Sequence, residues 1–219
     1  MLDRLEVYDD TTPRAAALNM AVDEALLEAA TSPVLRFYRW GCPSLSFGYF
    51  GSFADVSAQR AQREIVRRWT GGGVVPHGED LTYSVVIPAG HPFFARSSLE
   101  IYSALHEAIR RALTANGVEA TLANSVAPKV SEHCFANAVR ADVLSDGRKI
   151  AGAAHRRSRA GLLHQGSIQL PRLPAKFIDD FAGTLCDRFE RRTLSPELIG
   201  RAGAIAQLKY GTVAWLTRR

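Results

Sequence analysis

The sequence lacks the features that mark membrane, secreted and disordered proteins. Its 219 residues contain no run of about 18 apolar residues, and residues 1–4 do not begin a signal sequence. Its three cysteines are widely spaced and form no Cys-x-x-Cys pair, which favours free thiols in a reducing compartment. Hydrophobic residues make up 47% and charged residues 22% of the chain, as in ordinary globular proteins. We therefore expect a cytoplasmic protein that does not bind a membrane.

Common nucleotide-binding and nucleic-acid-binding motifs are also absent. The chain has neither a Gly-x-x-x-x-Gly-Lys-Ser/Thr loop nor a Gly-x-Gly-x-x-Gly turn that opens a helix. Arginines are frequent after residue 140, but they are dispersed and lack interleaved aromatic residues, so we expect no nucleic-acid partner. The net charge of +5 still favours an anionic substrate or an acidic partner. Because repeats and linkers are missing, residues 1–219 are predicted to form a single domain without a C-terminal accessory domain.

Hydrophobic periodicity predicts a chain of alternating strands and helices. Strands are expected at residues 5–8, 34–40, 43–50, 64–66, 81–87, 139–144, 148–157 and 162–170, and helices at 14–30, 55–63, 97–116, 174–189 and 195–210. Turns at 145–147 and 158–161 predict an antiparallel meander after the loop 124–137.

Local signals add detail to three of these elements. Ser97 and Glu100 form a capping-box pattern at the start of the helix 97–116, and Gly117 is expected to end it. We expect His106, on this helix, to lie at the surface. Gly48, inside the strand 43–50, marks a place where another chain segment or a ligand approaches closely.

Residues 67–84 hold the most distinctive stretch, with two arginines, three consecutive glycines, a histidine and an acid. The glycines are expected to connect two strands and to let a ligand approach the backbone N–H groups. Arg68 and Thr70 can add a forked cation and a hydroxyl group to bind an anion. The residues predicted to form this substrate-binding cradle are Arg68, Thr70, Gly71, Gly72, Gly73 and His77. The alternative is a glycine-rich hairpin with two surface arginines.

This stretch resembles the signature of the lipoate–protein ligase A family and its octanoyltransferase relatives. The similarity is carried by Arg67, Arg68, Thr70, the three glycines, His77, Asp80, Tyr83 and Ser84, and it continues from Asn19 to Trp215. It implies the α+β fold of the biotin and lipoate protein ligases, a class II synthetase-like catalytic domain with a mixed, largely antiparallel sheet flanked by helices. It also implies an apolar slot for an acyl chain, walled by the strands 34–40 and 43–50.

Lys149 lies on a strand that is otherwise rich in small and apolar residues. Strict alternation would place Lys149, Ala151 and Ala153 on one face, with small side chains beside the ammonium group. Such a cation can neutralise a phosphate or a developing oxyanion, although an isolated lysine after a turn is more often exposed to solvent. The residues 147–154 are similar to the second motif of the family. The resemblance implies that Lys149 is catalytic and that Gly152 and Asp142 belong to the substrate-binding site.

Residues 163–168 are similar to the third motif of the family, which commonly reads Gln-His-Gly-Ser or His-His-Gly-Thr. Here the order is His164, Gln165, Gly166, so glutamine stands where the family has histidine. We assign His164 and Gly166 to the substrate-binding site, and the exchanged order places the role of the His164 ring in question.

Cys134 is the predicted nucleophile. In octanoyltransferases that resemble ligase A, a cysteine in this loop carries the acyl group, and a cationic neighbour such as Lys149 or His133 would lower its pKa. The alternatives are a buried, unreactive thiol at Cys134 and a nucleophile at Cys186, whose surroundings predict a helix. A zinc site made by His133, Cys134, His155 and His164 matches no familiar spacing, and we expect no metal.

The resemblance implies that a lipoyl or octanoyl group is joined by an amide bond to a lysine of a lipoyl carrier domain. The expected carriers are the glycine-cleavage H protein or the E2 component of a 2-oxoacid dehydrogenase. We favour transfer through Cys134 between carrier proteins, with no tightly bound cofactor. The first alternative is a ligase that uses ATP and Mg²⁺ to make an acyl-adenylate beside Lys149 and works with an accessory protein. The second alternative is a catalytically silent domain that binds acyl groups or carrier proteins. Biotin ligation is disfavoured because a Gly-Arg-Gly-Arg type of loop is missing.

Overall fold

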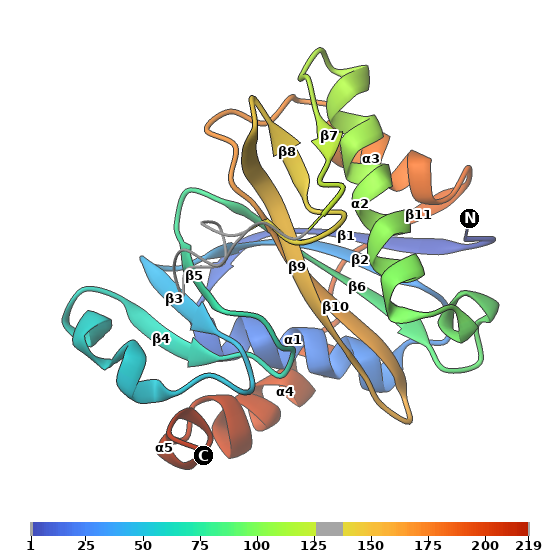
Figure 1. Ribbon diagram of the computed structural model, residues 1–219. Helices are drawn as coiled ribbons and strands as arrows, with labels where there is room; N and C mark the ends of the chain where they lie inside the picture. Colours follow the sequence, from blue (N-terminus) through green and yellow to red (C-terminus); the bar gives the residue numbers. More distant parts are fainter. Residues whose placement is uncertain (1, 126–137, 219) are drawn as a thin grey trace.

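The computed structural model describes residues 2–125 and 138–218, which form an α+β structure around one eight-stranded sheet (Figure 1). The strands of this sheet are, in spatial order, β11 (Phe189–Arg192), β1 (Leu5–Arg14), β2 (Val34–Trp40), β6 (Leu81–Pro88), β10 (Gly161–Ile168), β9 (Arg148–Arg157), β8 (Val143–Ser145) and β7 (Thr121–Leu122). Strand β1 pairs in parallel with β11 and with β2, whereas the remaining pairs are antiparallel. The predicted mixed, largely antiparallel sheet is therefore confirmed.

A smaller sheet of three strands lies beside the large one, toward the left of Figure 1. Its central strand β3 (Ser44–Phe47) pairs in parallel with β4 (Glu64–Arg67) and antiparallel with β5 (Val74–His77). Strand β5 was not predicted, because only four residues separate the glycines from the next turn. This short segment is extended because it pairs with β3, a strand about thirty residues earlier in the sequence.

Helices cover the two faces of the large sheet. They are α1 (Ala16–Ala29), α2 (Ser98–Ala115), α3 (Phe177–Leu185), α4 (Pro196–Ile205) and the short α5 (Val213–Leu216), and a π-helical turn, Ala206–Tyr210, follows α4. Side chains of α2 and α3 share one apolar core with the sheet, and those of α1 and α4 share a second core. No helix in the two described ranges is both long enough and apolar enough to cross a membrane.

The alternation of side chains along the central strands decides which core each residue enters. On β2, Leu35 and Phe37 pack with α2 and α3, while Val34 and Tyr38 pack with α1 and α4. The same alternation runs along β6 and β10, so a residue's position in the strand fixes the face on which its side chain lies.

Several local predictions are confirmed. The Ser97 side chain accepts a hydrogen bond from the Glu100 N–H, and the Glu100 side chain accepts one from the Ser97 N–H, as a capping box requires. Gly117 adopts a positive φ of 79° just after α2. Ser195 caps α4, and the predicted antiparallel meander is formed by β8, β9 and β10.

The segment before β8 differs from its prediction. Only Val143 and Leu144 of the expected strand 139–144 belong to β8 (Val143–Ser145), and Ala141 has a left-handed φ of 69°. The carboxylate of Asp142 accepts a hydrogen bond from the Val139 N–H at 2.7 Å. A side chain that binds nearby backbone in this way competes with a strand ladder, which accounts for the turn.

Other boundaries also shift. The expected helix 14–30 begins at Ala16 because β1 continues along β2 as far as Arg14, and the expected helix 55–63 consists of two short 3-10 helices, Phe53–Asp55 and Ser57–Ala61. The expected helix 174–189 is confined to α3, since Phe189 begins β11 and pairs with Leu5 of β1. At the start of α1 and after α3, a neighbouring strand supplies backbone hydrogen bonds that local sequence does not reveal.

The prediction that His106 lies at the surface is wrong. His106 is completely buried, its Nδ1 donates to the carbonyl oxygen of Ala141 at 2.7 Å, and its ring lies 4.1 Å from that of Tyr102. The residue stands four places after Tyr102 and three before Ile109, so helical spacing does place it on the apolar face. Burial lowers the pKa of His106 to about 4, although the nearby Asp142 carboxylate opposes the shift.

The burial of His106 predicts acid sensitivity. Because its folded-state pKa lies below the usual value near 6.5, the stability that it contributes is complete above pH 6.5 and is lost as pH falls toward 4. The variant His106→Gln keeps a donor for Ala141 but does not titrate. We expect it to reduce the loss in the free energy of unfolding at acid pH by on the order of 3 kcal/mol. Urea unfolding at pH 7.5 and pH 4.5 measures this difference, with His91→Gln, at a partly buried histidine outside the core, as the control. An unchanged pH dependence in His106→Gln would contradict the assignment.

Candidate functional site

A cavity where the two sheets meet contains much of the predicted site. Its empty volume is about 470 Å³, including the part that is open to solvent. Six predicted residues line it: Arg68, Gly72, His77, Lys149, Gly152 and Gly166. Met20 of α1, Tyr38 of β2 and Val75 of β5 add apolar wall. Segments nearly a hundred residues apart in the sequence therefore contribute to one cavity.

The loop of residues 68–73 crosses the end of β3 and does not close a hairpin, because β4 and β5 flank β3 on opposite sides. This corrects the hairpin alternative. The loop is held close to the chain that leaves β3: the Tyr49 N–H donates to the Thr70 carbonyl oxygen at 2.9 Å. A Cβ atom on Gly48 would lie 2.0 Å from the carbonyl oxygen of Gly72. The close approach expected at Gly48 is thus a backbone contact with the glycine loop, and Gly72 itself has a φ of 87°.

The two arginines before the glycines have different environments, and neither lies at the surface. Arg67 is 1% exposed, and its hydrogen-bond acceptors among the described residues are backbone carbonyl oxygens. These acceptors belong to Tyr49, Gly51, Trp215, Leu216 and Arg218. Arg67 therefore fastens the C-terminal segment to the loop after β3, a role that its position in the motif did not indicate.

Arg68 faces the cavity. Its Nη1 donates to the Ser46 hydroxyl oxygen at 2.6 Å, and its Nη2 donates to the carbonyl oxygens of Gly71 and Gly73 at 3.0 and 2.8 Å. The guanidinium group thus holds the glycine loop in shape while lining the cavity. Ser46, which was not predicted, enters the site through this contact.

Thr70 contacts the protein and does not line the cavity. Its hydroxyl donates to Gln165 Oε1 at 2.8 Å, and Gln165 Nε2 donates in turn to the carboxylate of Asp23 at 2.7 Å. Asp23 also accepts hydrogen bonds from Arg36 at 2.8 Å and from Ser84 at 2.7 Å. A buried polar network therefore joins the glycine loop to β10 and α1.

The exchanged order of His164 and Gln165 has a structural outcome. Gln165 lines the cavity, whereas His164 lies on the opposite face of β10, with its Nε2 3.2 Å from the Tyr83 hydroxyl. His164 is completely buried there, and burial lowers its pKa well below the usual value. The assignment of His164 to the substrate site is wrong, because neighbouring residues of a strand point to opposite faces. Gln165 is the residue that the motif analysis missed.

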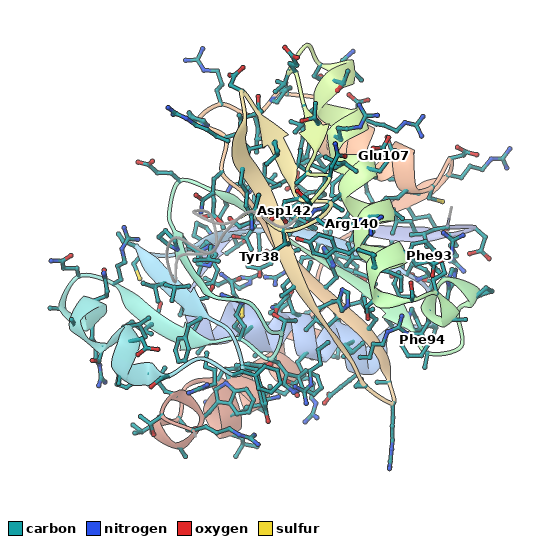
Figure 2. The ribbon with its side chains drawn as sticks, viewed as in Figure 1. Tyr38, Phe93, Phe94, Glu107, Arg140 and Asp142 are labelled. Carbon is teal, nitrogen blue, oxygen red and sulfur yellow. The ribbon has the colours of Figure 1, made fainter. Side chains whose placement is uncertain are left out.

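Lys149 lies inside the site, not in solvent. Its Nζ is 2.8 Å from Asp142 Oδ2, and the Tyr102 hydroxyl of α2 donates to Asp142 Oδ1 at 2.5 Å. Asp142 is completely buried, and its side chain is labelled near the middle of Figure 2. The alternative of a solvent-facing Asp142 is therefore wrong, and the carboxylate orients the lysine within the cavity wall.

A bulge in β9 changes the face on which Lys149 lies. Leu144 of β8 pairs with Lys149, but Val143 pairs with Ala151, so Ile150 is an extra residue. Consequently Ala151 packs in the core, while Lys149 and Gly152 share the cavity side. A Cβ on Gly152 would lie 2.4 Å from Lys149 Cε, so this glycine makes room for the lysine. The predicted grouping of Lys149 with Ala151 is corrected by this bulge.

His77 is held by ring and side-chain contacts. Its ring stacks on that of Trp40 at 4.0 Å, its Nδ1 lies 2.8 Å from Asp80 Oδ2, and its Nε2 lies 2.6 Å from Ser46 Oγ. Burial lowers the pKa of His77, and the hydrogen bond to Asp80 opposes this shift. Asp80 also accepts hydrogen bonds from Thr82 and Ser167 at 2.8 and 2.7 Å.

The predicted nucleophile Cys134 and its neighbour His133 lie outside the described residues. The rival Cys186 does lie within them: it is 2% exposed at the end of α3, and its thiol donates to the Arg188 carbonyl oxygen at 3.1 Å. Cys186 packs in the apolar core with α2 and α3, away from the residues that line the cavity, so it is not part of this site.

Known proteins resemble this chain over most of its length. Residues 15–171 match the family described as the lipoyl protein ligase A/B catalytic domain. The octanoyltransferase LipM of Oceanobacillus iheyensis is 41% identical over 170 residues, which cover 74% of this chain and 62% of that protein. The octanoyltransferase LipM of an Exiguobacterium species is 33% identical, with 84% of this chain and 72% of that protein covered. The match thus spans about three fifths to three quarters of these relatives.

The fold has a counterpart among solved structures. Protein Ta0514 of Thermoplasma acidophilum, a putative lipoate protein ligase with bound lipoic acid, superposes with a TM-score of 0.77. The superposition covers 99% of both chains at 22% sequence identity. At this identity the likeness concerns the fold, and it agrees with the predicted class of ligase-like α+β domains.

The close approach of Gly48 to the glycine loop predicts a steric effect. Gly48→Ala would place a methyl group on loop backbone that cannot rotate away, so we expect a loss of about 2 kcal/mol or more in the free energy of unfolding. Gly183→Ala is the matched control, because a Cβ there meets nothing within 4 Å. Chemical denaturation of both variants makes the comparison. Equal stability of Gly48→Ala and wild type would refute the close contact.

The network around Gln165 predicts a charge effect. Gln165→Glu would bring a second carboxylate close to Asp23 in a buried site, so its folded-state pKa should rise above the unfolded value near 4.3. The resulting loss in the free energy of unfolding, about 3 kcal/mol, should be absent below the unfolded pKa. It should grow as pH rises from there through the folded pKa. Denaturant unfolding at pH 4 and pH 7.5 tests this, with the half-buried Gln169→Glu as control. A penalty that does not depend on pH would argue against the pairing.

Proposed function

Because the chain belongs to the lipoyl protein ligase A/B catalytic-domain family, we propose that it transfers an octanoyl or lipoyl group to a lysine of a lipoyl carrier domain. The observation that carries the proposal is the placement of Lys149 and Arg68 on one cavity whose walls include Met20, Tyr38 and Val75. An apolar wall suits an acyl chain, and fixed cations suit the oxygen that gains negative charge when its carbonyl is attacked.

The proposed mechanism is transfer through Cys134. The Cys134 thiolate attacks the carbonyl carbon of an acyl thioester on a donor carrier, and the donor thiolate leaves and takes up a proton. The amine of the acceptor lysine then attacks the acyl–cysteine thioester, forms the amide bond, loses a proton and releases Cys134. This choice follows the octanoyltransferase relatives and the sequence position of Cys134 ahead of Lys149.

Lys149 is the proposed oxyanion stabiliser. Its ammonium group is held by Asp142 Oδ2, which also accepts a hydrogen bond from the Val139 N–H, while the Tyr102 hydroxyl donates to Oδ1. A cation that is positioned before the reaction needs little reorganisation when charge develops on the carbonyl oxygen. Gly152 permits this placement, because any side chain there would displace the lysine.

The proposed partners are an acyl-carrying donor protein and an acceptor domain of the glycine-cleavage H protein or E2 type. A cytoplasmic location is proposed with them. Transfer through Cys134 requires neither ATP nor Mg²⁺, whereas a ligase would need both and would pass through an acyl-adenylate. This difference makes the nucleotide requirement the most informative measurement.

The experiment combines the protein with a purified lipoyl domain and either an octanoylated carrier protein or octanoate with ATP and Mg²⁺. We expect mass spectrometry to find one octanoyl group on the acceptor with the acylated carrier alone. Cys134→Ser should abolish transfer, and Lys149→Ala should reduce kcat by about 100-fold or more. Cys42→Ser and Lys176→Ala are the matched controls, since both residues are exposed. A requirement for ATP together with normal activity of Cys134→Ser would overturn the transferase proposal.

A further inference from the structure

Four side chains of the site form one continuous hydrogen-bonded chain: Arg68, Ser46, His77 and Asp80. Ser46 Oγ lies 2.6 Å from Arg68 Nη1 and 2.6 Å from His77 Nε2, and His77 Nδ1 lies 2.8 Å from Asp80 Oδ2. The residues come from β3, β5 and the segments around them, and each is at most 7% exposed. Arg68, Ser46 and His77 also line the cavity.

The direction of every bond in this chain follows from chemistry. A guanidinium group only donates, so Ser46 Oγ accepts from Arg68. The Ser46 hydroxyl hydrogen can then be donated to His77 Nε2, which requires that this nitrogen carry no proton. His77 Nδ1 must in that case hold the single ring proton and donate it to the Asp80 carboxylate. With His77 neutral, each contact in the chain joins one donor to one acceptor, whereas a protonated ring would make Ser46 Oγ accept from two cations.

The surroundings keep His77 in this state. Burial and the charges of Arg68 and Arg63 lower the pKa of His77, while the hydrogen bond and charge of Asp80 raise it, and burial is the larger influence. Within residues 2–125 and 138–218, two uncharged groups also face the ring: Trp40 of β2 stacks on it, and the Thr82 hydroxyl of β6 lies 3.5 Å from Nδ1. Across the cavity, Lys149 of β9 is paired with Asp142.

We propose that Ser46, His77 and Asp80 are positioning residues that fix the Arg68 guanidinium group at the acyl-binding cavity, and that this relay operates only with neutral His77. The inference rests on the proposed acyl-transfer function and adds Ser46 and a pH dependence to it. None of the three residues needs to touch the acyl group, because they act through Arg68.

Protonation of His77 would break the relay in a defined way. Nε2 would become a donor, so Ser46 Oγ would face two donors and its own hydroxyl hydrogen would turn toward the cavity. Two positive groups, the imidazolium and the guanidinium, would then share one serine oxygen and repel each other. Binding of the acyl donor should therefore be intact above the His77 pKa and weaken as pH falls through it.

Enzyme kinetics with the full chain tests the relay. Ser46→Ala should raise the KM for the octanoylated carrier by about 10-fold, the effect of losing one hydrogen bond to a charged group, with a smaller change in kcat. The matched control is Ser44→Ala on the same strand, because the Ser44 hydroxyl donates to the Cys42 carbonyl oxygen and does not line the cavity. An unchanged KM in Ser46→Ala would overturn the role of Ser46.

The variant His77→Gln separates titration from geometry. Its amide can accept from Ser46 and donate to Asp80, but it cannot be protonated in the relevant pH range, whereas His77→Ala removes both functions. We expect His77→Gln to remain within a few-fold of wild type at pH 8. The kcat/KM of the wild type divided by that of His77→Gln should fall as pH drops below 6.5. The kcat/KM of the wild type divided by that of His91→Gln should stay constant. A pH-independent ratio for His77→Gln would refute the neutral-histidine requirement.

A spectroscopic measurement distinguishes failure of the relay from failure of the proposed function. Nitrogen NMR of the histidine rings in the full-length protein should show His77 neutral at pH 7.5, protonated at Nδ1, and should show a changed Nε2 signal in Ser46→Ala. This result would support the relay even if the protein transferred no octanoyl group. A ring protonated at Nε2 at that pH would reject it.

Discussion

The site depends on the close contact between the backbone at Gly48 and the carbonyl oxygen of Gly72. Because Gly48 has no side chain, the loop that follows β4 can lie directly against the end of β3. This contact sets the position of Arg68, whose guanidinium group bonds the loop carbonyls and Ser46 of β3 at the same time. Packing between the two backbone segments therefore requires glycine at position 48, and the positive φ of Gly72 favours glycine within the loop.

Buried polar networks connect this loop to the rest of the protein. One runs from Thr70 through Gln165 to Asp23 and the fully buried Arg36. Such charges are tolerated in the interior because each has an opposite partner and further hydrogen bonds. The networks are directional, so they orient the cavity walls more specifically than apolar packing would, and they link α1 and β10 to the glycine loop.

The cavity joins an apolar wall to two cations that are held by different means. Lys149 is oriented by a carboxylate, whereas Arg68 is oriented by carbonyl oxygens and a serine hydroxyl. Each cation is therefore fixed by its own set of contacts before a ligand binds.

The sequence alone predicted the capping of α2 and the meander β8 to β10 from local patterns. Its resemblance to a family predicted the fold class and brought together Arg68, His77 and Lys149, which line one cavity. Tertiary structure decided the rest. Strand β5 exists because β3 offers it a partner, and the bulge at Ile150 turns Lys149 and Gly152 to the same side. The assignments of His164 and His106 failed for the same kind of reason: a side chain's environment depends on which face of its strand or helix meets a neighbour, and that neighbour is distant in sequence. A motif locates a functional residue only approximately along the chain. In a strand, however, a shift of one position moves the side chain to the opposite face of the sheet.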